Sequence, residues 1–122
     1  MKPSVRVHGP TIGYILIIFI ISSVPSLRGP ELGFQLQDKV LHVLEFGFLG
    51  ILLQRSIYYQ YNITLKSVIW VLILGIGYGG FDEIHQSFVI GREASVGDFF
   101  ADAVGILLAC LIYLLIRWIK YR

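Results

Sequence analysis

The sequence predicts an all-α fold: an integral membrane bundle of four transmembrane helices. Of its 122 residues, 56% are hydrophobic and 15% are charged, whereas about 25% of the residues in an ordinary soluble domain are charged. The apolar residues fall in long runs that do not alternate with polar residues, as the strands of a membrane barrel would. Because a helix satisfies its own backbone hydrogen bonds, it is the structure expected for such runs in lipid.

The whole chain, residues 1–122, is expected to form a single four-helix domain, with spans at residues 8–24, 39–57, 65–84 and 98–119. Spans of about 20 residues each leave no room for a soluble domain. In the third span, Gly75 and Gly79 have the small-xxx-small spacing typical of a helix contact face. Cys110 lies in an apolar run, where a small buried side chain is expected.

The distribution of charge predicts how the chain is oriented. Three basic residues, Arg28, Lys39 and Arg92, fall on one side of the spans, and positive residues favour the cytoplasmic side. The other seven lie on the side of the termini: Lys2, Arg6, Arg55, Lys66, Arg117, Lys120 and Arg122. We therefore expect a multi-pass protein of the cytoplasmic membrane with both termini in the cytoplasm. All eight carboxylates lie on or near the opposite, extracytoplasmic side, which we interpret as the sign of a functional site.

These ionisable residues share helix faces, since successive residues of a helix are about 100° apart. Exposing each to lipid would cost about 2.5–3.5 kcal/mol at mid-membrane, so we expect the faces to turn inward and, with Arg92, to line one pocket. Asp38 and Asp98 leave an alternative open, that they only cap their helices. The faces are Asp38, His42 and Glu45 on the second span; Asp82, His85 and Gln86, with Glu83 beside them, on the third; and Asp98 and Asp102 on the fourth.

Two pairs of residues raise the question of metal binding. His42 with Glu45, and Asp82 with His85, are three residues apart, like pairs that build metal sites in helical bundles. One pair runs in the reverse order to the Glu-x-x-His of di-iron proteins. The sequence therefore assigns no metal ligand, and it does not identify a cofactor.

Two segments carry a family resemblance: DKVLHVLEFGFLG at residues 38–50 and FDEIHQSFVIGREASVGDFFADAVG at residues 81–105. Their order and spacing resemble the VanZ-like family, with its D-K-x-x-H-x-x-x-F-x-x-L-G segment, D-E-x-H-Q segment, G-R loop and D-x-x-x-N-x-x-G helix. Position 102 departs from this pattern, because it is Asp where the family usually has Asn. The family positions are held by Asp38, Lys39, His42, Asp82, Glu83, His85, Gln86, Arg92, Asp98 and Gly105.

The resemblance implies a protein with four transmembrane spans from a family associated with resistance to teicoplanin-type glycopeptides. It also implies kinship with membrane enzymes that act on lipid head groups through a polar site between helices. The partner expected is a membrane lipid, either a polyprenyl lipid or a phospholipid bound through its head group, and not a nucleic acid. Small-residue faces leave room for an oligomer.

Our leading hypothesis is a lipid head-group phosphohydrolase or transferase. His42 and His85 would transfer protons, oriented by Asp38, Asp82 and Asp98. Substrate-binding roles are expected for Lys39, Glu45, Glu83, Gln86, Arg92 and Asp102. Two interpretations of Arg92 remain open: it pairs with a carboxylate, or it binds a phosphate. The alternative hypothesis is a non-enzymatic protein that binds an envelope lipid or a partner. A transporter ranks third, because the inner halves of the spans carry no ionisable relay.

Overall fold

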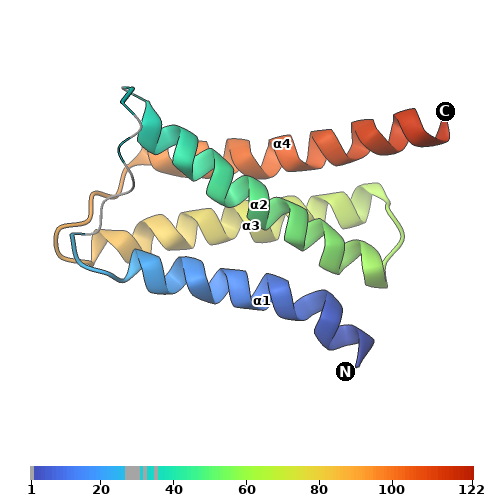
Figure 1. The fold of residues 1–122 in the computed structure, drawn as a ribbon, viewed down its shortest axis with the longest axis horizontal. Helices are drawn as coiled ribbons and strands as arrows, with labels where there is room; N and C mark the ends of the chain where they lie inside the picture. Colours follow the sequence, from blue (N-terminus) through green and yellow to red (C-terminus); the bar gives the residue numbers. More distant parts are fainter. Residues whose placement is uncertain (1, 27–30, 32, 35) are drawn as a thin grey trace.

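Four helices, each antiparallel to the next in the chain, make up the structure, a computed structural model that describes residues 2–26, 31, 33–34 and 36–122 (Figure 1). They are α1 (Pro3–Ser22), α2 (Gln37–Gln60), α3 (Leu65–Ser87) and α4 (Val96–Tyr121). The described residues include no strand, so the all-α prediction is confirmed. All four helices are long and apolar enough to cross a membrane, as expected of a multi-pass membrane protein.

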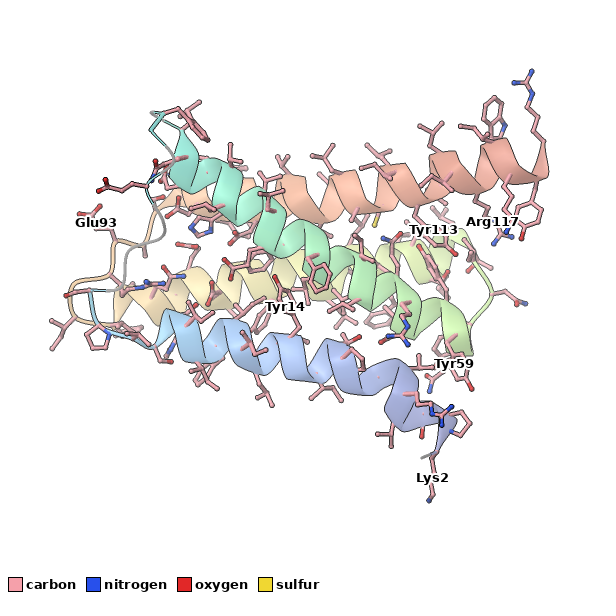
Figure 2. All side chains as sticks on the ribbon, viewed as in Figure 1. Lys2, Tyr14, Tyr59, Glu93, Tyr113 and Arg117 are labelled. Atoms are coloured by element: carbon pink, nitrogen blue, oxygen red, sulfur yellow. The ribbon has the colours of Figure 1, made fainter. Side chains whose placement is uncertain are left out.

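The antiparallel arrangement gives the bundle two chemically different ends. Both termini lie at one end, which we call the terminal end (Figure 1). The other, the site end, is formed where α1 and α3 end and α2 and α4 begin. In Figure 2, Glu93 lies at the site end, and Lys2, Tyr59 and Arg117 lie toward the terminal end. Arg28, one of the residues used to predict the orientation, is outside the described residues.

The N-cap of helix α4 is a serine, so the nearby carboxylate of Asp98 is available for other contacts. The Ser95 hydroxyl accepts the backbone N–H of Asp98 at 2.9 Å, so Ser95 is the N-cap. Helix α2 has Leu36 as its N-cap and no side-chain cap. The alternative that Asp38 and Asp98 only cap their helices is therefore wrong. Both carboxylates instead contact the ammonium group of Lys39.

Close packing of α2 against α4 holds the bundle together, and these two helices share the most extensive contact. A Cβ atom on Gly105 would lie only 2.5 Å from the backbone oxygen of Val43, so the two backbones can meet only because residue 105 has no side chain. At Gly75 and Gly79 an added Cβ atom would meet side chains of α4, Ile106 at 2.6 Å and Asp102 at 3.1 Å, which confirms the predicted contact face. The buried apolar core contains Ile18, Phe46, Leu49, Leu53, Val71, Ile106 and Cys110.

Helix α1 lies at the edge of the bundle and contacts α2 and α3. Near the terminal end, the Thr11 hydroxyl lies 2.6 Å from that of Ser56 and donates to the backbone oxygen of Leu52 at 3.0 Å. Further along α1, the Tyr14 hydroxyl donates to the backbone oxygen of Glu45 at 2.8 Å. These bonds fix α1 along α2, so that the end of α1 reaches the polar residues of the site end.

Candidate functional site

A cavity of about 910 Å³ opens at the site end, and all four helices contribute to its lining. This end collects the predicted polar faces because the second and fourth spans begin there and the third ends there. The lining is strongly polar. It includes Ser22 of α1, Asp38, Lys39, His42 and Glu45 of α2, Gln86 of α3, Arg92 and Glu93 of the following loop, and Asp98 of α4.

His42 is held between two carboxylates of α4. Its Nδ1 lies 2.8 Å from Oδ1 of Asp102, which is completely buried. Its Nε2 lies 3.7 Å from Oδ2 of Asp98. An ionised carboxylate can only accept a hydrogen bond, so the Nδ1–H of His42 donates to Asp102. This contact fixes the plane of the imidazole ring and leaves Nε2 available at the cavity, an arrangement suited to proton transfer.

Two cationic side chains line the cavity beside this histidine. The Lys39 ammonium lies 2.5 Å from Oδ1 of Asp98 and 2.9 Å from Oδ2 of Asp38. Arg92 is half-buried in the loop between α3 and α4. Asp98 thus stands between the Lys39 ammonium and the imidazole of His42. The cavity combines a histidine with two cations, a set that can hold an anionic group next to a proton-transferring one.

Two more carboxylates, both on α3, are buried beside the cavity. Asp82 accepts a hydrogen bond from the Ser22 hydroxyl at 2.5 Å and another from the Gln86 amide at 3.0 Å. Glu83 accepts the backbone N–H of Ser95 at 3.3 Å. Its Oε1 lies 3.9 Å from Nδ1 of His42. These bonds join α1, α3 and the start of α4.

The structure does not bring His85 into the cavity. Its Nε2 lies 2.8 Å from the Ser23 hydroxyl, and its ring stacks on Phe19 with the centroids 4.6 Å apart. His85 follows Asp82 by three residues and is therefore turned about 60° away from it around the helix axis. That turn carries the side chain past the interior to the flank of α1. The catalytic role expected for His85 stays a prediction, which this placement does not favour.

Among the described residues, two groups of side chains have ligand atoms close enough to hold a metal ion. One is His42, Glu83 and Asp98, and the other is Asp82, Glu83 and Asp102. Neither group is one of the i, i+3 pairs weighed from the sequence. Helix periodicity relates residues within one span only, whereas both groups draw ligands from different helices.

Sequence reasoning missed two serines of the site. Ser22 lies at the end of an apolar run, so the sequence does not mark it as a site residue. In the structure its hydroxyl donates to the buried Asp82. Ser95 could have been found, because a serine three residues before an acidic residue at a helix start is a capping signal.

The fold and the site define a multi-pass membrane protein with a cluster of buried ionisable residues at one end of a four-helix bundle. Within that class, the chain belongs to the VanZ/LLP1 family, whose sequence model matches residues 10–117. The resemblance seen in the sequence is therefore confirmed, and any link to antibiotic resistance is a property of the family as a whole. Comparison with curated proteins and with solved structures found no match.

Proposed function

We propose that the protein is a membrane enzyme that hydrolyses or transfers the phosphate-linked head group of a membrane lipid in the cavity at the site end. The observation that carries this proposal is the contact between His42 and the buried Asp102, at 2.8 Å. It orients an imidazole whose second nitrogen is available to a bound substrate, next to cationic side chains that suit a phosphate.

His42 acts in this proposal as the general base. Its Nε2 takes the proton from water or from an acceptor hydroxyl while that oxygen attacks the phosphorus atom. Asp102 keeps Nδ1 protonated and stabilises the imidazolium that forms. The imidazolium then returns the proton to the leaving oxygen. Asp98, whose Oδ2 lies 3.7 Å from Nε2, would stabilise the imidazolium once Nε2 has taken the proton.

Lys39 and Arg92 bind the phosphate in this proposal. The planar guanidinium of Arg92 can hold two phosphate oxygens at once, and the Lys39 ammonium contributes a point charge. The location supports a lipid substrate, because the cavity lies at the ends of helices long and apolar enough to cross a membrane, and the ends of such helices reach the head groups. The outer faces of the helices are apolar, which suits the tail of a phospholipid or of a polyprenyl lipid.

The site end faces the extracytoplasmic side of the cytoplasmic membrane in this proposal. The positive-inside rule supports that orientation, since seven of the ten Lys and Arg residues belong to the terminal end. Alkaline phosphatase fused after Arg122 should be inactive, whereas a fusion in the loop after α3 should be active. The reverse pattern would place the cavity in the cytoplasm.

Reconstitution tests the reaction. The purified protein is placed in vesicles that contain a phospholipid and a polyprenyl phosphate, and the products are measured by lipid mass spectrometry. The wild type should release or transfer a phosphate-linked group, and Arg92→Lys should do so more slowly, because Lys keeps the charge but loses the two-point contact. Arg55→Lys is the matched control at the terminal end and should retain the wild-type rate. Unchanged lipids with all three proteins would favour the alternative function, binding of an envelope lipid without reaction.

A further inference from the structure

Three buried carboxylates meet between α3 and α4. Asp82, Glu83 and Asp102 each offer an oxygen, and these oxygens lie within 4.8 Å of one another. Asp82 is 2% exposed, Glu83 is 7% exposed and Asp102 is fully buried. Like charges so close together and shielded from water repel one another strongly. His42 contacts Asp102 and the charge of Arg92 acts on Asp82, and these two positive charges oppose three negative ones.

Hydrogen bonding leaves part of this cluster unsatisfied. Both oxygens of Asp82 accept a hydrogen bond, from Ser22 and from Gln86. Glu83 and Asp102 each have one bonded oxygen and one buried oxygen, Oε1 and Oδ2 respectively, without a partner among the described residues. Buried polar atoms in native proteins nearly always have a partner, so two orphaned oxygens in one cluster point to a missing ligand.

The two orphaned oxygens are turned toward the space between the helices. Oε1 of Glu83 lies 3.9 Å from Nδ1 of His42, the nitrogen that also contacts Asp102. Oδ2 of Asp102 faces α3 at Gly79, where a Cβ atom would lie 3.4 Å from it. Gly79 is one helical turn before Asp82 and Glu83. The absence of a side chain there keeps the oxygen of Asp102 close to the α3 carboxylates.

We propose that Asp82, Glu83 and Asp102 bind a divalent cation of the Mg²⁺ or Mn²⁺ class beside the cavity. Oxygen ligands from carboxylates select such hard cations. A cation bound there is coordinated by the two unpartnered oxygens, Oε1 of Glu83 and Oδ2 of Asp102, and it offsets the repulsion among the carboxylates. The other oxygen of Asp102 remains in contact with His42. The second group is less suited, because Asp98 is already paired with Lys39 and His42 with Asp102. The site stands on this geometry alone and does not require the proposed reaction.

Manganese titration tests the site. The full-length protein in detergent micelles is treated with EDTA, dialysed and titrated with Mn²⁺, and bound Mn²⁺ is followed by electron paramagnetic resonance. The wild type should bind a single Mn²⁺ that Mg²⁺ displaces. Glu83→Gln and Asp102→Asn, which keep the side-chain shape, should each weaken binding by about 10- to 100-fold or more, by analogy with the effect of losing partners of metal ligands. Glu93→Gln, a loss of one exposed carboxylate at the same cavity, should bind like the wild type.

Two outcomes would overturn the proposal: no saturable Mn²⁺ binding by the wild type, or equal binding by all four proteins. If a variant does not fold, the wild type still tests the site, because a cation that binds only the folded state raises the melting temperature of the protein. An unchanged melting temperature with and without Mn²⁺ would count against the site. No lipid substrate is present, so a failure here is distinguishable from a failure of the proposed reaction.

Discussion

Two histidines at the same end of the bundle have opposite surroundings. His42 lies among carboxylates from α3 and α4 and lines the cavity. His85 lies beside α1, where its ring stacks on Phe19 and its Nε2 contacts Ser23. Both residues belong to polar faces that look alike in the sequence. Their difference shows that the chemistry open to a side chain in this bundle is decided by the neighbouring helix that it meets.

The neighbours of His85 along α3 explain its position. Phe81 and Ile84 lie on the same side of the helix and are 49% and 64% exposed, so this side faces the apolar surroundings of the bundle. Asp82, 2% exposed, faces the interior. His85 is therefore at the boundary between the interior and the lipid-facing surface, whereas His42 is turned to the cavity between α2, α3 and α4.

The largest effect is expected from replacing the two histidines separately. His42→Ala should lower the rate of lipid turnover by about 10²- to 10⁴-fold, the usual loss when a general acid–base group is removed. His85→Ala, outside the cavity, should keep the rate within a small factor of the wild type. Turnover by each purified variant in vesicles, with its amount in the membrane as the control, measures this. Equal losses of turnover in both variants would mean that His85 and its neighbours belong to the same functional site as His42.

The sequence was sufficient for the parts of the structure that depend on a single helix. Long apolar runs gave the four spans, and spacing of small residues gave the contact face at Gly75 and Gly79. The gathering of His42, Glu45, Arg92 and Asp98 around one cavity also followed from the depth of these residues in their spans.

The sequence could not show how each helix is rotated about its axis relative to its neighbours. Asp82 and His85 differ by about 60° in direction, and that angle separates the interior from the flank of α1. The sequence also could not show that Glu83, placed beside its polar face, would be shared by both groups of metal-ligating side chains. Such groups depend on contacts between helices, which no periodicity within one span encodes.

An intermediate effect is expected from forcing α2 away from α4. The added Cβ of Gly105→Ala would meet the backbone of Val43 and of Gly47, and backbone cannot move aside alone. We expect a loss of about 3 kcal/mol in the free energy of unfolding, the upper part of the range for overpacking. The contact between His42 and Asp102 should weaken, and the pairing of His85 with Ser23 should survive.

Gly77→Ala is the matched control for this substitution, because a Cβ atom at residue 77 meets nothing within 4 Å. Unfolding of the variants in mixed detergent micelles gives the change in stability, and lipid turnover reports on His42. If Gly105→Ala is as stable as Gly77→Ala, the close approach of α2 and α4 is not what holds the surroundings of His42.

The smallest effect is expected from two adjacent serines at the end of α1, each of which serves one of the compared regions. The Ser22 hydroxyl is buried and donates to Asp82, so Ser22→Ala removes a hydrogen bond to a buried carboxylate and should cost about 1.5 kcal/mol. Ser23 is half-buried and its hydroxyl bonds the backbone oxygen of Phe19 and contacts His85, so Ser23→Ala should cost only about 0.5 kcal/mol.

Lipid turnover should separate the two serine variants more clearly than stability does, because Ser22 lines the cavity and supports Asp82. Ser22→Ala should therefore slow turnover and Ser23→Ala should leave it unchanged. The opposite order would show that the flank of α1 around His85, and not the carboxylates around His42, is the region that the reaction uses.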